Sequence, residues 1–531
     1  MSDTPSFSGP FNLADYLLEH NLADRPSKTA VLCGDERYSY ADVAALTART
    51  GNVLAGLGVG MENRVLIVLP DGIEFVAAWL ATLRIGAVFA MANTIHTAED
   101  YLYYLDYTRA PVAVIHESVL APFEQIRGRA RHLRSLLVVG EAGSHLSFAK
   151  ETAAASDRLE TMQTEADDIA GWLFTSGSTG KPKAAVHFHR DFAYNIETYA
   201  SRILGMRADD VTVSVPKLFF GYATGTNLMF PFAAGGCTAL FAERSTPAKI
   251  FEMIEKHRPT VLTCVPTMIN AMLAAASGPD GGRHDLSSLR VCLSAGEALP
   301  GELYRRFKDR FGVEILDGIG SAEMFHIYIS NRFGDVRADS LGRIVPGYEA
   351  RIVGPDGTDV PPGRQGTLWI KGGSTALCYW QRRESSRKTF LGDWCVTGDQ
   401  FTRDEQGYFY YSGRTDDMLK VSGIFVSPLE IEDCLLAHPA VAEVAIVGYN
   451  DESGLTKPKA FIALKEGHTP TQELAVELKM FVKGKLSPYK YPRWVDFVDR
   501  LPRSDRGKVL RTELRAGFPC LLSVALSPTG E

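Results

Sequence analysis

Short runs of Val, Ile and Leu alternate with longer amphipathic stretches along much of the chain. Continuous apolar runs of this length are typical of buried parallel strands, and the stretches between them have the length of crossover helices. The pattern predicts strands at 64–69, 111–115, 133–139, 169–174, 211–215, 260–265 and 290–294. Stretches 249–256 and 301–311 are predicted helices, with Leu303, Phe307 and Phe311 on one face of the second. The fold class is therefore α/β with mainly parallel strands, whose ligands bind where strand ends open into loops.

The pattern changes after Val345, where turn sequences become frequent. Gly-Pro-Asp-Gly at 354–357 and Asp-Glu-Gln-Gly at 404–407 separate short strand-like runs, which predicts a β-rich subdomain at about 345–412. A second break at 413–417 precedes a unit with a helix at 473–486, whose apolar residues lie on one side. This tail is expected to have a small core of its own.

Length and charge narrow the function classes. A chain of 531 residues exceeds a single compact core, so two or more domains are expected. The net charge of −7 comes without a clustered basic face, which argues against nucleic-acid binding. A local anion site remains compatible with this composition.

The cysteines and the apolar windows indicate the cellular setting. Eight cysteines are scattered without a Cys-x-x-Cys pair, as expected of reduced core residues. The first residues lack the pattern of a signal peptide, and the most apolar window, 75–92, is interrupted by Arg84 and Gly86. We expect no membrane span and a cytoplasmic location.

A loop rich in glycine and hydroxyl residues directly follows the run at 169–174. It reads Thr-Ser-Gly-Ser-Thr-Gly-Lys-Pro-Lys from Thr175 to Lys183. Glycines let a backbone approach an anion, hydroxyls donate hydrogen bonds and lysines add charge, so the loop predicts a nucleoside triphosphate site. It is not a Walker loop, because its glycines lie too close together and Pro182 follows Lys181 where a magnesium-binding hydroxyl is needed. A plain Ser/Gly surface loop is the alternative.

Four further motifs follow this loop along the chain. They are Asp317-Gly-Ile-Gly-Ser-Ala-Glu323, Thr397-Gly-Asp399, Gly413-Arg-Thr-Asp-Asp417 and Arg506-Gly-Lys508. In order and spacing the five motifs resemble the adenylate-forming enzymes, the superfamily of acyl-CoA synthetases, firefly-type luciferases and peptide-synthetase adenylation domains. Within it, Pro216-Lys-Leu-Phe-Phe-Gly-Tyr222, Gly320-Ser-Ala-Glu-Met-Phe-His326 and Asp416-Asp-Met-Leu-Lys-Val-Ser-Gly423 look most like benzoate-CoA ligases.

The resemblance covers nearly the whole chain and implies a domain plan. It implies an N-terminal domain, 1–414, of αβαβα layers with a distorted β-barrel subdomain, and a small mobile α+β domain, 415–531. It also implies the reaction. A carboxylate attacks the α-phosphate of ATP to give an acyl-adenylate and pyrophosphate, and the thiol of coenzyme A then displaces AMP.

By resemblance, Lys508 is the expected catalytic residue, an ammonium that reaches both the carboxylate and the α-phosphate. A solvated surface lysine is its alternative. Glu323 is the expected Mg²⁺ ligand, with a salt bridge to an arginine as the alternative. The expected nucleotide-binding residues are Thr175, Ser176, Gly177, Ser178, Thr179, Gly180, Lys183, Gly296, Glu297, Asp317, Gly318, Asp399 and Arg414. At Asp317 and Gly296, ordinary residues of strand-end turns would look the same.

The segments implied to hold the acid are short and rich in glycine and aromatic residues. They supply Phe220, Gly221, Tyr222, Ala295, Gly320, His326 and Ile327. Such a set suits a flat ring better than an acyl chain, which needs a long apolar tunnel. Gly221 stands where relatives specific for benzoate tend to have Ala, which leaves room for a ring substituent such as the amino group of 2-aminobenzoate. His326 either bonds such a substituent or packs as a core histidine.

The small domain is implied to rotate between the two half-reactions. The hinge falls at Asp416; in one pose Lys508 enters, and in the other Lys420 and Gly423 line the path of the pantetheine thiol. For Gly423, a turn glycine in a hairpin is an equal alternative.

One position departs from the family pattern. Ala322 stands where relatives usually carry Thr, and losing that hydroxyl costs about 0.5 to 1.5 kcal/mol, with Ser321 as a substitute donor. The sequence thus supports an aryl-CoA ligase, with two alternatives: an adenylation enzyme that loads a carrier protein, and a non-catalytic nucleotide-binding relative. A homodimer is also left open.

Overall fold

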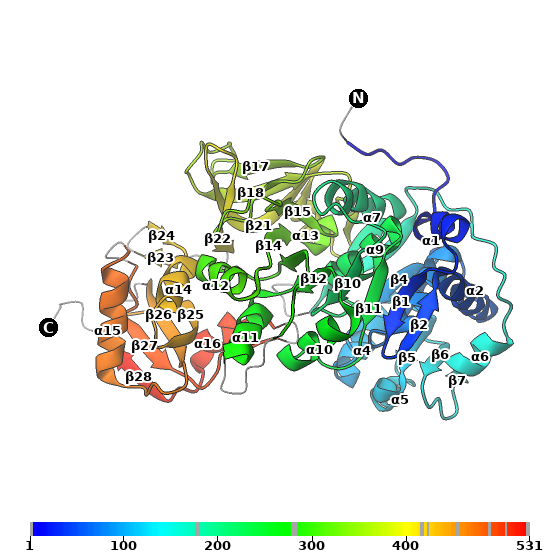
Figure 1. Ribbon diagram of the computed structural model, residues 1–531, viewed down its shortest axis with the longest axis horizontal. Helices are drawn as coiled ribbons and strands as arrows, with labels where there is room; N and C mark the ends of the chain where they lie inside the picture. Colours follow the sequence, from blue (N-terminus) through cyan, green and yellow to red (C-terminus); the bar gives the residue numbers. More distant parts are fainter. Residues whose placement is uncertain are drawn as a thin grey trace.

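The computed structural model of the chain describes residues 4–175, 181–277, 284–414, 419–421, 424–451, 456–486, 490–504 and 507–526, without the side chains of 420, 424 and 425. Two large sheets form its N-terminal part, and a separate small unit with α14 to α16 lies at the opposite end from α1 and α2 (Figure 1).

The first large sheet carries the loop after 169–174. Its strands, in spatial order, are β19 (Cys378–Tyr379), β9 (Lys183–Phe188), β8 (Ile169–Thr175), β4 (Val88–Met91), β3 (Arg64–Val68), β5 (Val112–His116), β6 (Ser135–Val139) and β7 (Leu146–Ser147). From β8 to β7 all neighbours are parallel, and β9 and β19 are antiparallel additions at one edge.

The second large sheet carries the Asp317–Glu323 motif. Its order is β16 (Arg343–Ile344), β15 (Ile327–Ser330), β14 (Ile315–Gly320), β13 (Val291–Ser294), β12 (Val261–Cys264), β10 (Val211–Ser214), β11 (Cys237–Leu240), β1 (Thr29–Cys33) and β2 (Glu36–Ser39). The strands from β14 to β1 are parallel neighbours. The predicted mainly parallel α/β fold is confirmed.

Helices cover both sheets in three layers. Between the sheets lie α1 (Leu13–Asp24), α2 (Tyr40–Gly56), α3 (Ile73–Arg84), α7 (His189–Asn195) and α9 (Phe230–Ala234), in one core with residues of both sheets. Helix α3 is buried on almost every side, as expected of a helix that is apolar all round. The outer face of the first sheet is covered by α4 (Ala98–Thr108) and α5 (Leu120–Ile126), and that of the second by α10 (Pro247–His257), α11 (Pro266–Ser277) and α12 (Gly301–Phe311). The expected αβαβα layers are confirmed.

Three short helices complete this part of the chain. They are α6 (Phe148–Ala154), α8 (Gly221–Thr224) and α13 (Arg383–Thr389). The chain also makes π-helical turns at Ile196–Ser201 and Gly225–Met229, and a 3-10 turn at Ala322–Met324.

The β-rich part is a five-stranded antiparallel sheet. It contains β17 (Glu349–Val353), β18 (Gly366–Lys371), β20 (Phe390–Leu391), β21 (Trp394–Arg403) and β22 (Phe409–Arg414). Strand β21 lies at its centre, so its residues are paired on both sides.

The small C-terminal unit has its own core. A hairpin of β23 (Leu419–Val421) and β24 (Ile424–Val426) precedes a sheet of β25 (Val441–Asn450), β26 (Thr456–Leu464), β27 (Trp494–Phe497) and β28 (Leu522–Ala525). Helices α14 (Pro428–Leu436), α15 (Gln472–Lys483) and α16 (Arg511–Gly517) complete it. Residues of α14 and α15 pack against this sheet, as expected of a tail with its own core.

All seven strands predicted from the apolar runs are present, with ends shifted by one or two residues. The pattern did not single out several others, among them β1, β2, β4 and β11. Strand β4 was merged with α3 into one apolar window, although Gly86, with φ of 70°, turns the chain between them.

No helix in the described part of the chain is both long enough and apolar enough to cross a membrane. The eight cysteines are free; four are buried, and Cys520, at the C-terminal end, is exposed. The expectation of core cysteines is therefore wrong for Cys520, which follows α16 rather than an apolar strand.

Strands β4 and β8 pack so closely that Gly171, in β8, has no room for a side chain. A Cβ atom placed on Gly171 would lie 2.1 to 2.5 Å from three ring carbons of Phe89. The Phe89 ring is buried between Trp79 and Phe192, so it has no room to move aside. We expect Gly171→Ala to destabilise the protein by about 1 to 3 kcal/mol, seen as a lower thermal unfolding midpoint.

The matched control is Gly56→Ala, at the end of α2. A Cβ there meets no atom within 4 Å, and Ala restricts the unfolded chain, so we expect a gain of about 0.4 to 1 kcal/mol. An unchanged midpoint for Gly171→Ala would contradict the described packing.

Candidate active site

The predicted phosphate loop joins β8 to β9. Thr175 pairs with Lys183, so the two ends of the loop lie side by side where β8 ends and β9 begins. Ser176, Gly177, Ser178, Thr179 and Gly180 lie outside the described residues. The Nζ atom of Lys183 lies 3.7 Å from the ring centre of Tyr379, in β19. Burial lowers the pKa of Lys183, and the negative charge of Glu323 opposes this effect.

Glu323 lies in the 3-10 turn after β14, beside the same tyrosine. The Tyr379 hydroxyl donates a hydrogen bond to Glu323 Oε1, and the backbone N–H of Ala376 donates to the Glu323 carbonyl, 2.8 Å. Tyr379 therefore contacts both the loop lysine and the carboxylate, and it fixes their separation. Its sequence surroundings gave no signal for this role.

Asp399 and Arg414 face each other on β21 and β22. They are register partners, and Arg414 Nη1 lies 3.0 Å from Asp399 Oδ1. Arg414 also donates to the Thr397 carbonyl, 3.0 Å. Only 8% of Asp399 is exposed, and burial raises its pKa while Arg414 and Lys508 oppose that rise. Because β21 and β22 form a hairpin, these two residues from separate motifs lie side by side.

Lys508 is carried by a tight turn of the small unit. Arg503 and Val509 form a β-bridge, and Ser504 N–H donates to the Lys508 carbonyl, 2.8 Å. Gly507, before the lysine, has φ of 80°, a conformation that favours glycine. The charge of Lys508 acts on Asp399, so the small unit presents this lysine to the charged residues of the large one.

These residues form one charged group at the meeting of three sheets. Electrostatic interactions connect Lys183 with Glu323 and Arg414, and connect Asp399 with Glu323, Arg414 and Lys508. Residues that are far apart in the sequence, from Lys183 to Lys508, thus interact in the fold. Such a group, with three cations and two carboxylates, suits the binding of a polyanion.

The predicted nucleotide-binding residues Gly296, Glu297 and Asp317 lie at the ends of β13 and β14. Ala295 is buried, Gly296 has φ of 89°, and Glu297 Oε2 accepts from the N–H and the hydroxyl of Thr267, 3.2 and 2.7 Å. Asp317 is buried, which raises its pKa well above the ordinary value. Its Oδ1 has no hydrogen-bond partner among the described residues.

Strand packing requires two glycines of β14. A Cβ atom on Gly318 would lie 2.8 Å from the Ile329 carbonyl oxygen, and one on Gly320 would lie 2.4 Å from that of His326. Both directions point at β15, whose first residue is the buried Ile327. These glycines therefore permit close pairing of β14 with β15.

The Phe220–Tyr222 segment begins α8 and lies against β8. A Cβ atom on Gly221 would lie 3.3 Å from Leu173 Cδ1 and 3.6 Å from the Phe325 carbonyl oxygen. The space beside Gly221 thus accepts a methyl group with a small shift of Leu173. The Phe220 ring packs on that of Phe219, with centres 4.2 Å apart.

His326 is enclosed by aromatic rings. It is 2% exposed, its Nε2 donates to the Tyr222 carbonyl at 3.0 Å, and its ring centre is 4.8 Å from that of Phe230. Burial lowers its pKa to about 3, so it is neutral near pH 7. This arrangement favours the core-histidine alternative, in which His326 orients the Tyr222 segment instead of contacting a substituent.

Asp71 also holds this segment, and sequence reasoning missed it. Its Oδ1 accepts from the backbone N–H of Leu218, 2.8 Å, and the Leu218 carbonyl accepts from the Thr224 hydroxyl, 2.6 Å. Burial raises the pKa of Asp71 to about 6 and lowers that of Lys217 to about 8. Asp71 and Leu218 are more than a hundred residues apart, so no motif with a recognisable spacing contains both.

Three predicted residues of the second pose cannot be placed. Asp416 and Gly423 lie outside the described residues. Lys420 lies in β23, but its side chain is not described. The hinge and the thiol path therefore remain predictions.

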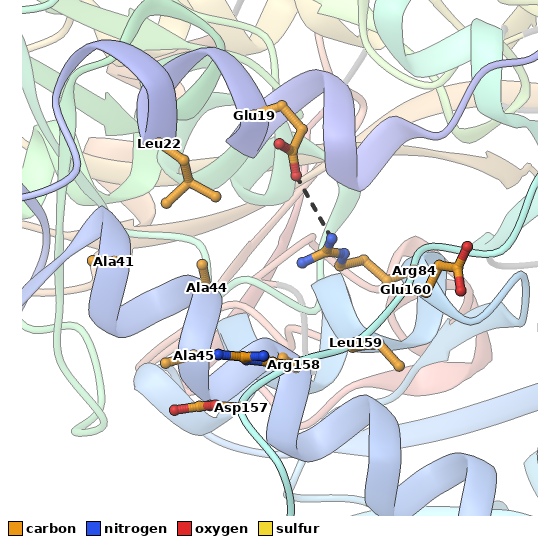
Figure 2. Close-up of a pocket in the computed structure, with 11 residues that line it drawn as sticks. Glu19, Leu22, Ala41, Ala44, Ala45, Arg84, Asp157, Arg158, Leu159 and Glu160 are labelled. Atoms are coloured by element: carbon orange, nitrogen blue, oxygen red, sulfur yellow. Dashed lines mark ion pairs between the residues drawn. The ribbon is translucent and has the colours of Figure 1, made fainter.

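A surface groove lies elsewhere. It has a volume of about 600 Å³ and is lined by α1, α2, α3 and the connection at 157–160; there Arg84 pairs with Glu19, 3.6 Å (Figure 2). Its lining includes none of the predicted site residues, and it is open to solvent. We place the active site at the charged group and not in this groove.

Known proteins match nearly the whole chain. Residues 18–380 match the family model of AMP-binding enzymes, and residues 430–508 match that of the AMP-binding enzyme C-terminal domain. A benzoate–CoA ligase of Thauera aromatica is 45% identical over 95% of this chain and 96% of its own length. A p-hydroxybenzoic acid–AMP ligase of Mycobacterium tuberculosis is 32% identical over 96% of this chain and 68% of its own.

Solved structures agree with these relatives. An anthranilate CoA ligase in complex with anthranoyl-AMP has a TM-score of 0.92 and 39% identity, covering 97% of this chain and 98% of its own. A benzoate CoA ligase from Burkholderia xenovorans has a TM-score of 0.89 and 42% identity, covering 95% of this chain and all of its own.

Replacing Asp71 tests the support of the Phe220–Tyr222 segment. Asp71→Ala leaves the Leu218 N–H buried without an acceptor, a cost of about 1 to 3 kcal/mol that the segment relieves by moving. We expect the KM for an aromatic acid to rise about 3- to 10-fold with the KM for ATP unchanged, measured by steady-state kinetics. Asp71→Asn, which keeps an acceptor oxygen, should be milder.

Asp210→Ala is the matched control. Asp210 is also buried and accepts from a backbone N–H, that of Arg207, but it supports the chain before β10. We expect lower stability without a selective rise in the KM for the acid. Equal changes in both KM values for Asp71→Ala would refute the assigned role.

Proposed function

The chain belongs to the AMP-binding enzyme family, and on this premise we propose that it is an AMP-forming aryl-CoA ligase for benzoate or a small substituted benzoate. The observation that carries the proposal is full-length similarity to ligases named for benzoate and anthranilate, at 39% to 45% identity. The charged group described above supplies the features that such chemistry needs.

In the first half-reaction the acid and ATP combine. A carboxylate oxygen attacks the α-phosphorus, the bond from that phosphorus to the bridging oxygen of the β-phosphate breaks, and pyrophosphate leaves. In this proposal the Lys508 ammonium offsets the negative charges of the two reactants, supported by the effect of its charge on Asp399. Asp399 accepts hydrogen bonds from the ribose hydroxyls with Arg414 holding its carboxylate, while Lys183 and the 175–183 loop bind the phosphates.

The residues present fit a magnesium ion bound largely through the nucleotide. Among the described residues no three His, Cys, Asp or Glu side chains form a metal cluster, and Glu323 is a carboxylate whose charge acts on the loop lysine, Lys183. Mg²⁺ typically takes one or two protein carboxylates together with substrate phosphates and water. When bound, it neutralises phosphate charge; Tyr379 orients the Glu323 carboxylate for it.

In the second half-reaction coenzyme A enters. Its thiol sulfur attacks the acyl carbon, the bond from that carbon to the AMP oxygen breaks, and the thiol proton is released. Lys508 has no role in this step and occupies space near the adenylate. We propose that rotation about Asp416 removes it and brings Lys420 and Gly423 to the thiol path.

A second candidate is an aryl-adenylate enzyme that loads a carrier protein. The similarity to a p-hydroxybenzoic acid–AMP ligase favours it, at the lower identity of 32%. The test is a coupled assay with benzoate, its 2-, 3- and 4-substituted forms and octanoate. Aryl-CoA and AMP formed in equal amounts support the ligase. Aryl-adenylate and pyrophosphate formed without thioester support the carrier-loading enzyme, and faster turnover of octanoate contradicts the aryl pocket.

Lys508→Ala should separate the half-reactions. Without the ammonium we expect aryl-dependent pyrophosphate exchange to fall about 100-fold or more. Thioester formation from synthetic benzoyl-AMP and coenzyme A should stay within a few-fold of wild type. Lys483→Ala, on α15 of the same unit, is the control, and undiminished exchange in Lys508→Ala would rule out the assigned role.

Gly221→Ala should change substrate choice. The added methyl fits against Leu173, so the fold is kept, but it takes space beside the ring. We expect kcat/KM for 2-aminobenzoate to fall about 10-fold or more relative to benzoate, measured by competing substrates. An equal effect on both acids would contradict the pocket; Gly320→Ala, which clashes with the His326 carbonyl, should lower both alike.

A further inference from the structure

Arg503 connects the turn that carries Lys508 to the large N-terminal part. Its Nη1 donates to the Gly507 carbonyl, 2.7 Å, and to the Thr267 hydroxyl oxygen, 3.0 Å. Its Nη2 lies 3.1 Å from Glu443 Oε2. One guanidinium therefore bonds three acceptors on two separate parts of the chain.

The three contacts have different consequences. Glu443, in β25, and Gly507 belong to the small unit, so these two contacts orient Arg503 and brace the Lys508 turn from within. Thr267 is the second residue of α11, in the large part. This third contact ties Arg503 to the large part, and Arg503 in turn bonds the Gly507 carbonyl, just before Lys508.

Thr267 is itself held in place. Glu297 Oε2 accepts from both the hydroxyl and the N–H of Thr267, so the hydroxyl proton points to Glu297 and its oxygen accepts from Arg503. A Cβ atom on Gly507 would lie 3.8 Å from Glu297 Oε1, so the Lys508 turn also packs against this carboxylate. The receiving surface is thus prearranged on the end of β13 and the start of α11.

We propose that Arg503 is a positioning residue for the first half-reaction, a latch that holds the small unit in the pose in which Lys508 faces the nucleotide. This inference rests on the proposed two-step function. In the described pose the charge of Lys508 acts on Asp399 and Arg503 bonds Thr267. Arg503 bonds the carbonyl of Gly507, the neighbour of Lys508, so it moves together with Lys508. Any rotation that withdraws Lys508 must therefore break the Arg503–Thr267 bond.

A contact made in one of two poses shifts the equilibrium toward that pose. Elsewhere between the two parts like charges approach each other: burial lowers the pKa of Lys465, on the small unit, and Arg306 of α12 adds to that effect. The interface thus contains both an attractive contact and an opposing one. Such a balance suits a unit that must leave this pose once per turnover.

Arginine suits the position better than lysine. Its planar fork places two donor groups at fixed angles, and it stays charged at any working pH. A lysine has one ammonium and would bond Thr267, Gly507 and Glu443 together only with strained geometry. Arg503→Lys should therefore recover part of the function and not all of it.

The test measures the half-reactions separately. For Arg503→Gln we expect benzoate-dependent pyrophosphate exchange to fall about 5- to 30-fold, because the variant loses the bond to Thr267 together with those to Gly507 and Glu443. Thioester formation from benzoyl-AMP and coenzyme A should be unchanged or faster. Arg500→Gln, at an exposed arginine upstream on the same segment, is the matched control and should leave both half-reactions at the wild-type rate.

A second variant removes the partner instead. Thr267→Val keeps the shape of α11 and deletes the accepting hydroxyl, so it should give the same selective loss of exchange. In the double variant the loss should equal that of Arg503→Gln alone, because Arg503→Gln already lacks the bond to Thr267. This arm remains informative if Arg503→Gln folds poorly.

The outcomes separate the inference from the function on which it rests. No exchange by the wild-type enzyme with any aromatic acid would overturn the proposed function. Wild-type exchange with equal slowing of both half-reactions in Arg503→Gln, or with additive losses in the double variant, would overturn the latch alone.

Discussion

The site has to bring two anions into contact, and this electrostatic constraint governs much of the architecture. A carboxylate and a triphosphate repel each other, so cations must surround the point of attack. The large part supplies Lys183 and Arg414, each balanced by a carboxylate on a neighbouring strand, Glu323 and Asp399. The remaining cation, Lys508, comes from a separate unit with its own core. A fixed cation would serve the first step and obstruct the second, whereas a cation on a separate unit can be withdrawn.

The sequence predicted most of what depends on local pattern. The seven apolar runs became strands because each is buried on both faces, where continuous hydrophobicity is required. Asp399 and Arg414 could be assigned from motifs, and their pairing follows from one hairpin. Strand β4 was missed because a helix buried on all sides and the strand after it are equally apolar, so only the turn at Gly86 separates them.

Residues that act through long-range contacts could not be predicted. Tyr379, Asp71 and Thr267 each bond a partner far away in sequence, and none stands in a recognisable spacing. For the glycines the difficulty is different. A motif shows where a glycine stands but not why a side chain is absent there. Gly318 and Gly320 prove to be needed by the pairing of β14 with β15, while the space beside Gly221 is large enough for a methyl group. Only the direction of the missing Cβ distinguishes these cases.

Ala322 can be understood from the same kind of packing. Its carbonyl accepts from His187 Nε2, 2.7 Å, and Asp191 holds the other ring nitrogen, 3.0 Å. His187 and Asp191 are both buried, so the backbone beside Glu323 is fixed from β9 and α7. The alanine methyl packs with the cluster that contains Tyr379, the residue that orients Glu323. A threonine hydroxyl here would contribute one hydrogen bond to a phosphate, a modest gain beside the fixed placement of the carboxylate. The departure at Ala322 therefore removes a donor and leaves the geometry of Glu323 intact, which is the arrangement expected of an enzyme and not of a relative that has lost its site.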